Sequence, residues 1–193
     1  MKRIGLLGGS FDPPHKGHLF ISLEARKLLK LDEVWWIVTP QNPLKISKPA
    51  TYHERVMNCR NLTRNYPIIV KEIEKKIGSS YSYKTLNYIL NYYKNIKFFW
   101  LMGADNLISF HKWQKWQKIF DNMSIVIFKR HGYNTRALKS IASKKYIQSK
   151  ILGSDIILEN FNKLPSWTIV ENKEIKISST EIRNQREKLR GKN

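Results

Sequence analysis

Two adjacent glycines and two histidines stand close together near the start of the chain, in Gly8-Gly9-Ser10-Phe11-Asp12-Pro13-Pro14-His15-Lys16-Gly17-His18. Glycines carry no Cβ and let the backbone approach a ligand closely. His15 and His18 share one face if they lie on the first turn of a helix. The N-terminus of such a helix offers free N–H groups and a positive dipole end, which favour phosphate. The stretch therefore predicts a site where a phosphate meets two imidazole rings.

The elements on either side of this stretch predict a strand-to-helix turn. An apolar run at Ile4–Leu7 is typical of a buried strand, and apolar residues recur at helical spacing from Leu19 to Lys30. In an open parallel sheet such turns lie outside the carboxyl ends of the strands, where ligands bind. The chain continues by alternating apolar runs with helical segments, which predicts an α/β fold with a Rossmann-like, doubly wound, mostly parallel sheet and helices on both faces. The expected strands are 34–38, 68–70, 97–102, 124–128, 155–158 and 167–170, and the expected helices include 51–64, 81–93 and 135–149.

Other interpretations of the glycine–histidine stretch are weaker. A dinucleotide fingerprint needs G-x-G-x-x-G, which Gly5-Leu6-Leu7-Gly8-Gly9-Ser10 does not match. A zinc site could use His15 and His18, but Asp12 is the one obvious third ligand nearby and no second His/Cys cluster completes it. A purely structural turn does not account for two histidines beside adjacent glycines.

Further segments offer chemistry at the ends of predicted strands. The strand 34–38 is followed by Thr39-Pro40-Gln41-Asn42-Pro43-Leu44-Lys45, whose prolines exclude regular helix or strand. The strand 97–102 is followed by Gly103-Ala104-Asp105, where the glycine allows close approach and the carboxylate can accept hydrogen bonds from ribose hydroxyls. An N-cap role for Asp105 is compatible with that one. Arg130, which follows the strand 124–128, is a secondary candidate for nucleotide contact.

A second anion site is predicted near the carboxyl end, at Ile177-Ser178-Ser179-Thr180-Glu181-Ile182-Arg183. Hydroxyls and N–H groups at a helix N-terminus bind anions, and the fork of donors on Arg183 can reach the same anion. A serine cap with Glu181 in a capping box accounts for part of this pattern. Trp113 could stack on a flat ring, or it could share a core face with Trp116.

The composition predicts one folded domain. The chain has 193 residues, of which 41% are hydrophobic, enough for a core and too apolar for a disordered chain. We expect a single domain over residues 1–193, with a tail that frays after about residue 185. Cys59 is the one cysteine of the sequence, so no intramolecular disulfide can form and a reducing compartment fits. No secretory apolar region or run of about 18 apolar residues is present, so we expect a cytoplasmic protein without a membrane partner.

The charge favours anionic partners. The 35 basic and 15 acidic residues give a formal net charge of +20. Nucleotides, nucleic acid or an acidic surface would all be attracted. The lysines are scattered through a sequence rich in Lys, Ile, Asn and Tyr, so we attribute the charge mainly to composition bias and nucleotide attraction. We expect no dedicated nucleic-acid partner, although the segment 135–149 is the best candidate for a nonspecific polyanion patch.

These motifs resemble those of the H-x-G-H nucleotidylyltransferases, and within them the bacterial nicotinate-nucleotide adenylyltransferase family. The first stretch matches G-G-[ST]-F-D-P-x-H-x-G-H, and the resemblance covers nearly the whole chain. The other matches are T-P-x-N-P-x-K at 39–45, S-Y-[ST]-x-x-T-L at 80–86, G-x-D-x-L at 103–107, F-x-x-W-x-x-W at 110–116 and I-S-S-T-x-[IV]-R at 177–183.

The resemblance implies that ATP and nicotinate mononucleotide are the substrates, that deamido-NAD and pyrophosphate are the products, and that Mg²⁺ accompanies ATP without a dedicated metal cage. The implied catalytic residues are His15, His18, Lys45 and Arg183. The implied ATP-binding residues are Gly8, Gly9, Ser10, Phe11, His15, His18, Gly103, Asp105, Ile177, Ser178, Ser179, Thr180 and Arg183. The implied mononucleotide-binding residues are Ser10, Phe11, Thr39, Lys45, Ser82, Trp113 and Gln114.

Three alternatives remain open at this point. A phosphopantetheine adenylyltransferase would share both phosphate motifs. An enzyme that prefers nicotinamide mononucleotide would differ in main-chain contacts near Ser82. A nonenzymatic nucleic-acid binder would explain the charge but not the phosphate turns. A homo-oligomer is compatible with each of them.

Overall fold

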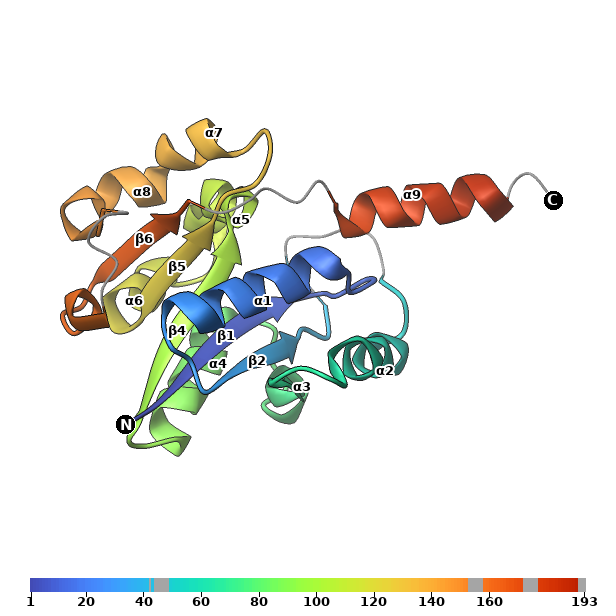
Figure 1. Ribbon diagram of the computed structural model, residues 1–193, viewed down its shortest axis with the longest axis horizontal. Helices are drawn as coiled ribbons and strands as arrows, with labels where there is room; N and C mark the ends of the chain where they lie inside the picture. The colour runs from blue at the N-terminus through green and yellow to red at the C-terminus, as the bar shows by residue number, and fades with distance from the viewer. Residues whose placement is uncertain (42, 44–48, 153–157, 172–176, 191–193) are drawn as a thin grey trace.

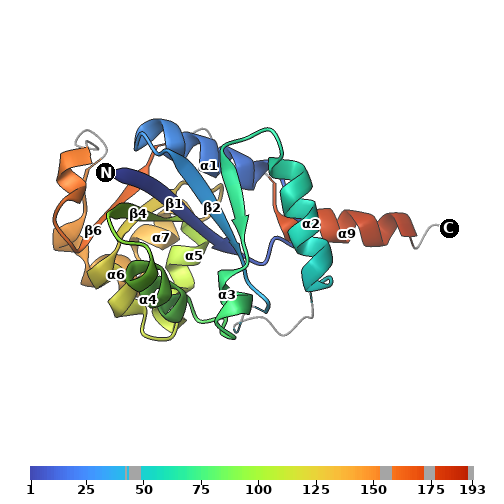
Figure 2. The same ribbon diagram turned by 90° about the horizontal axis from the view of Figure 1, so that it is seen from below.

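The computed structural model describes residues 1–41, 43, 49–152, 158–171 and 177–190. In this part of the chain, six strands form one parallel sheet in the order β3-β2-β1-β4-β5-β6. Figures 1 and 2 show the sheet between two helical layers. The strands are β1 Lys2–Gly9, β2 Glu33–Val38, β3 Ile68–Lys71, β4 Ile96–Gly103, β5 Ser124–Phe128 and β6 Ser166–Val170. The predicted doubly wound α/β class is confirmed.

The helices mostly follow the predicted segments. They are α1 Lys16–Leu28, α2 Tyr52–Thr63, α3 Ile73–Lys76, α4 Ser82–Tyr92, α5 Ala104–Ser109, α6 Trp116–Asn122, α7 Asn134–Leu138, α8 Ile141–Lys145 and α9 Ser179–Arg190, with 3-10 turns η1 Phe110–Lys112, η2 Ile147–Ser149 and η4 Leu158–Phe161. The N-terminal end of α9 lies beside the rest of the molecule, and its carboxyl end projects away from the sheet and the other helices (Figure 1). None of the helices described here is long and apolar enough to cross a membrane.

Alternate side chains of the strands build two separate cores. Trp35 belongs to the core under α3 to α8, whereas Trp36 belongs to the core under α1 and α2. This follows from the period of two residues along a strand, which sends neighbouring side chains to opposite faces. Continuous apolar runs are typical of such doubly covered parallel strands.

The sheet reverses its winding between β1 and β4. From β1 the chain proceeds outward to β2 and β3, and then returns to β4 on the other side of β1. The carboxyl ends of these strands lie at the same height in the sheet: Gly9 at the end of β1 pairs with Val38 at the end of β2, and Gly103 at the end of β4 pairs with Phe128 at the end of β5. A crevice at this switch point is where ligands bind in sheets of this kind.

Two predicted segments differ from the structure. The basic helix expected at 135–149 is broken into α7, α8 and η2. The break has a local cause: Ser140 Oγ caps α8 by accepting from the N–H of Ser143, and the hydroxyl of Ser143 donates back to the carbonyl of Leu138 at 2.6 Å. The predicted strand 155–158 lies outside the described residues except for Leu158, which begins η4.

Arg55 joins the loops at the carboxyl edge of the sheet. Its side chain is 1% exposed, and it donates to four backbone carbonyls. These belong to Ser10 at 2.6 Å, Thr39 at 2.8 Å, Pro40 at 2.8 Å and Ala50 at 3.0 Å. One guanidinium therefore fixes the turns that follow β1 and β2 and the entry to α2. The helical pattern of 51–64 gave no sign of this role.

We expect Arg55→Ala to lower the free energy of unfolding by about 3 kcal/mol, because it leaves buried carbonyls without donors. Urea-induced unfolding followed by tryptophan fluorescence measures the change. Arg60→Ala is the matched control on the same helix: Arg60 pairs with Glu72 at 2.7 Å at the surface. Its loss should change stability by less than about 1 kcal/mol. Equal losses in the two variants would contradict the role given to Arg55.

Candidate active site

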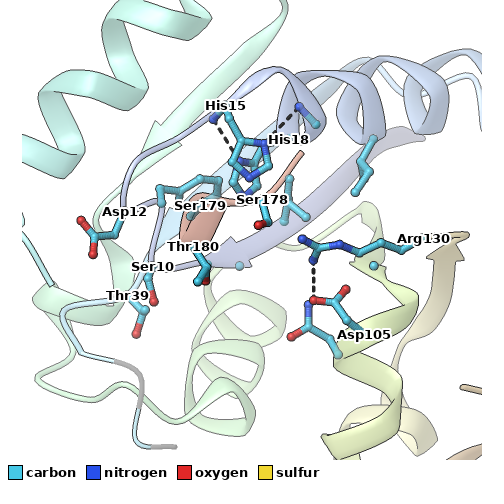
Figure 3. Close-up of a pocket in the computed structure, with 18 of the residues that line it drawn as sticks. Ser10, Asp12, His15, His18, Thr39, Asp105, Arg130, Ser178, Ser179 and Thr180 are labelled. Carbon is cyan, nitrogen blue, oxygen red and sulfur yellow. Dashed lines mark hydrogen bonds and ion pairs between the residues drawn. The ribbon is translucent and has the colours of Figure 1, made fainter. Parts of the chain in front are cut away.

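A cavity of about 820 Å³ opens at the carboxyl edge of the sheet (Figure 3). Its lining comes from the turn after β1, from the ends of β2, β4 and β5, and from the segment 177–183. Segments from both ends of the chain therefore face the same hollow at the predicted switch point.

The turn after β1 is held by a stack of aromatic rings. Phe11 has a left-handed backbone with φ of 48°, and its side chain is 2% exposed. Its ring stacks on Trp36 with centroids 4.7 Å apart, and it lies 4.9 Å from the ring of His18. Burial of this ring explains how a non-glycine residue keeps a strained conformation here. The stacked rings therefore support the turn that carries the histidine pair.

The two histidines cap α1 by hydrogen bonding to its first turn. His15 is the N-cap, and its Nδ1 accepts from the N–H of Gly17 at 3.1 Å. The Nδ1 of His18 accepts from the N–H of His15 at 3.2 Å (Figure 3). A nitrogen that accepts from a backbone N–H carries no proton, so the proton of each neutral ring is on Nε2. The capping pattern thus makes both rings Nε2–H donors.

His15 is neutral over the physiological pH range. Burial, followed by the positive charge of Arg130, lowers its pKa to about 4, although Glu181 acts in the opposite direction. The rings of His15 and His18 lie with centroids 3.9 Å apart. Neutral rings can lie this close without the repulsion that two imidazolium charges would bring.

The glycine between the histidines is required by space. A Cβ at Gly17 would lie 2.9 Å from Nδ1 of His15 and 3.1 Å from Cγ2 of Ile177. The first contact would break the cap, and the second would push away the segment that leads into α9. The H-x-G-H spacing therefore serves both the cap and the approach of the chain's far end.

The segment 177–183 binds directly to the turn after β1. Ser179 Oγ donates to the carbonyl of Pro13 at 2.9 Å. Arg183 Nη1 donates to the carbonyl of Asp12 and lies 3.6 Å from the Asp12 carboxylate. Ser178 caps α9, accepting from the N–H of Glu181 at 3.1 Å and donating to the Glu181 carboxylate at 2.9 Å. The N-termini of α1 and α9 thus border one cavity.

Asp105 and Arg130 form an ion pair on the opposite rim. Oδ2 of Asp105 accepts from Nη1 of Arg130 at 2.5 Å (Figure 3). Oδ1 of Asp105 is buried and has no hydrogen-bond partner among the described residues. A Cβ at Gly103 would lie 2.5 Å from that oxygen, so the glycine gives the carboxylate its room. The structure therefore places Arg130, a secondary candidate from sequence, beside a primary one.

A third part of the lining comes from aromatic and small polar residues. Trp113 is half-buried and lines the cavity. Its ring centroid lies 4.7 Å from that of Phe110 and 6.4 Å from that of Trp100. Trp116 instead packs against Phe120 and Tyr146, at 6.1 and 5.8 Å. Trp113 therefore borders the cavity, whereas Trp116 does not.

Nearly every predicted site residue lines this cavity. Those that do are Gly8, Gly9, Ser10, Phe11, His15, His18, Thr39, Ser82, Gly103, Asp105, Trp113, Gln114, Ile177, Ser178, Ser179, Thr180 and Arg183. Lys45 lies outside the described residues, so its predicted place stays a prediction. The lining shows where these residues lie, and their roles toward ligands are taken up below.

Sequence reasoning missed Glu74. Glu74 belongs to the run 71–76, whose many charges are typical of a solvated segment, yet it is 3% exposed and lines the cavity. The run hides a short helix, α3, whose first turn buries Ile73 and Glu74. Five charged residues in six gave no signal that one of them points inward.

The zinc alternative lacks ligands in the part of the chain that the structure describes. No group of three His, Cys, Asp or Glu side chains gathers there as a metal site. His15 and His18 also use Nδ1 to accept backbone hydrogen bonds. In this structure the two histidines are therefore arranged to donate hydrogen bonds from Nε2.

Comparisons with known proteins agree with this geometry. The family model described as "Cytidylyltransferase-like" matches residues 6–185. A protein of Cereibacter sphaeroides named "Probable nicotinate-nucleotide adenylyltransferase" is 40% identical over 180 residues, covering 93% of this chain and 96% of that protein. A protein of the same name from Agrobacterium fabrum is 38% identical, covering 94% of this chain and 97% of that protein.

Solved structures add a likeness of fold. The nicotinic acid mononucleotide adenylyltransferase of Plasmodium falciparum, solved in complex with NaAD, superposes with a TM-score of 0.70 at 20% identity. The match covers 95% of this chain and 83% of that one. Since the family model spans residues 6–185 and relatives about 40% identical align along nearly their full length, the chain belongs to the nicotinate-nucleotide adenylyltransferase family, within the cytidylyltransferase-like superfamily.

Proposed function

We propose that this protein transfers the adenylyl group of ATP to nicotinate mononucleotide and releases pyrophosphate. The observation that carries the proposal is the convergence of residues 12–18 and 177–183 on one cavity, through the contacts of Ser179 with Pro13 and of Arg183 with Asp12. Two helix N-termini and a pair of neutral imidazole donors then face the same volume, which suits a polyphosphate. Membership of the family supplies the identity of both substrates.

The reaction needs alignment and charge neutralisation more than a protein nucleophile. A 5′-phosphate oxygen of the mononucleotide attacks the α-phosphorus of ATP, while the bond from that phosphorus to the bridging oxygen of the β-phosphate breaks. Pyrophosphate leaves opposite the attacking oxygen. Since the attacking phosphate is already an anion, holding the two anions in line is the main catalytic task.

The histidine pair and the second anion site share the developing charge. His15 and His18 donate from Nε2 to the reacting phosphate, and Arg183 and the N–H groups at the start of α9 stabilise the leaving pyrophosphate. Lys45 is expected to add a positive charge to the same phosphates. Burial keeps His15 neutral in the free protein, so it contributes a directed hydrogen bond rather than a fixed charge.

The two nucleosides take the remaining lining. Asp105 accepts from the ribose hydroxyls of ATP, with Gly103 leaving room for the sugar and Gly8 and Gly9 for the phosphates. Trp113 stacks on the pyridine ring, and main-chain groups near Ser82 bind its carboxylate. Ser10, Phe11, Thr39 and Gln114 complete the mononucleotide side, in the roles that the family resemblance implies.

Mg²⁺ enters with ATP in this proposal and neutralises phosphate charge. The described residues fit a metal cage poorly, because no three potential ligands gather there, and Asp12 is paired with Arg183 and Asp105 with Arg130. The phosphates are therefore its main ligands. We also expect the protein to act in the cytoplasm, where its single cysteine stays reduced.

Pyrophosphate release from ATP tests the proposal directly. Nicotinate mononucleotide, nicotinamide mononucleotide and phosphopantetheine are supplied in turn to the purified protein. Release that depends on a pyridine mononucleotide supports the proposal. Release with phosphopantetheine alone, or none with any acceptor together with steeply salt-dependent nucleic-acid binding, would overturn it.

His18→Ala is expected to lower kcat/KM by more than about 100-fold, the effect of removing one donor that acts on charge in the transition state. Steady-state pyrophosphate release measures the loss. His53→Ala serves as the control, because His53 is exposed on α2 outside the cavity. Near-normal turnover of the His18 variant would remove this residue from the mechanism.

Trp113→Ala is expected to raise the KM for the mononucleotide by about tenfold or more, since a lost aromatic stack is worth roughly 1.5 kcal/mol. The KM for ATP should change little. Trp116→Ala is matched to it, because Trp116 is also half-buried but packs on Phe120 and Tyr146. If both variants changed only stability, Trp113 would be a core residue and no more.

A further inference from the structure

Glu74 is a buried carboxyl group that the proposed mechanism leaves unused. Its side chain is 3% exposed, yet it forms part of the cavity lining. Oε1 accepts from the hydroxyl of Thr85 at 3.2 Å. Oε2 is buried and has no hydrogen-bond partner among the described residues. A buried oxygen without a partner is costly unless a ligand or water completes it.

The position of Glu74 ties it to the start of α4. Thr85 belongs to the first turns of α4, which begins at Ser82 with no side-chain cap and no acidic residue in its first turn. Ser80, Tyr81 and Ser82 line the cavity together with Glu74. The N–H groups of a helix start without a side-chain cap therefore lie near a carboxyl oxygen that no described residue contacts by hydrogen bonding.

We propose that Glu74 sets the preference of this end of the cavity between an acid and an amide on the pyridine ring. In this arrangement the protonated side chain donates from Oε2 to the carboxylate of the acid, and the ionised side chain accepts from the N–H₂ of the amide. The inference rests on the proposed function, because it takes the pyridine nucleotide to be the acceptor substrate.

The hydrogen-bonding pattern leaves Oε2 of Glu74 for a ligand. Thr85 donates to Oε1, so a neutral carboxyl can carry its proton on Oε2, which has no partner among the described residues. Burial raises the pKa of Glu74 above 4.5, while the hydroxyls of Thr39 and Thr85 oppose the shift. A carboxylate bound next to it would raise that pKa further, since two like charges cannot both ionise cheaply at close range.

The neighbours of Glu74 in the described part of the chain do not compensate its charge. From α2, Tyr52 interacts with Glu74, and burial keeps the Tyr52 phenol neutral by raising its pKa. Thr39, which follows β2, and Thr85 of α4 offer hydroxyls. No ion pair with Glu74 occurs among the described residues, and Lys75, the adjacent cation, lies over the Tyr52 ring at 5.3 Å. The ionisation of Glu74 is therefore felt by a ligand in the cavity.

The sign of the pH dependence follows from these contacts. Below its raised pKa Glu74 is neutral and favours the acid. Above that pKa it is ionised, repels the acid and favours the amide. Selectivity for nicotinate over nicotinamide mononucleotide should therefore fall as pH rises. Both mononucleotides carry the same phosphate, so its titration cancels in the ratio of the two kcat/KM values.

The test measures kcat/KM for both mononucleotides by pyrophosphate release, over a pH series that starts at 4.5, the ordinary pKa of a glutamic acid. The inhibition constant of the amide against the acid is measured in the same series. We expect the acid-to-amide ratio of the wild-type protein to fall roughly tenfold, the effect of one pKa unit of coupling between the two carboxyl groups. A flat ratio in the wild-type protein overturns the inference without any variant.

Variants separate a direct role from a structural one. In Glu74→Gln the ratio should be independent of pH, because the amide can donate or accept but cannot titrate. Thr85→Val removes a hydroxyl that stabilises the ionised form, so the fall should move to higher pH. Glu72→Gln is the matched control, since Glu72 pairs with Arg60 outside the cavity. It should keep the wild-type profile.

The outcomes distinguish this inference from the proposed function. A wild-type protein that turns over pyridine mononucleotides with a pH-independent ratio overturns the role of Glu74 alone. A Glu74→Gln variant that keeps the wild-type fall does the same. A protein that releases no pyrophosphate with either mononucleotide overturns both.

Discussion

The contact between the first turn of the sheet and the start of the last helix is the constraint on which the site depends. Ser179 and Arg183 reach Pro13 and Asp12 across 166 and 171 residues of sequence. Bringing two segments together over such a span costs conformational entropy. The sheet offsets this cost because it carries both segments to the same edge. Without this contact the histidine pair would face solvent instead of a bordered cavity.

The contact also shows how charge is arranged in a very basic chain. Asp12 neutralises part of Arg183, and its other oxygen accepts from the N–H of Ala50 at 3.3 Å. The adjacent His15 is kept neutral by burial and by Arg130. In the proposed function, anions are therefore bound by helix N-termini and directed donors, while the scattered lysines supply a long-range positive field.

The sequence predicted what depends on local spacing, and it failed where tertiary packing decides. The apolar runs located most of the parallel strands, and the spacing of His15 and His18 placed both rings together at the first turn of α1, because both follow from helix and strand periodicity. The N-cap role of His15 was not predicted. Arg55 and Glu74 could not be found in this way. Their partners are backbone carbonyls and a cavity wall that exist only after β2, α2 and α4 have packed. The broken helix at 135–149 has the same origin, since serine side chains competed there with the helix for backbone groups.

The ion pair of Asp105 and Arg130 orients the carboxylate that the proposed function assigns to the ribose of ATP. Arg130 holds Oδ2 at 2.5 Å and leaves Oδ1 without a partner among the described residues. In the proposed function the ribose diol would donate to Oδ1, which leaves the ion pair intact. Arg130 thus orients the carboxylate, and its positive charge also lowers the pKa of His15. One arginine, two residues beyond the end of β5, therefore links the ribose side of the proposed site to the protonation state of its phosphate side.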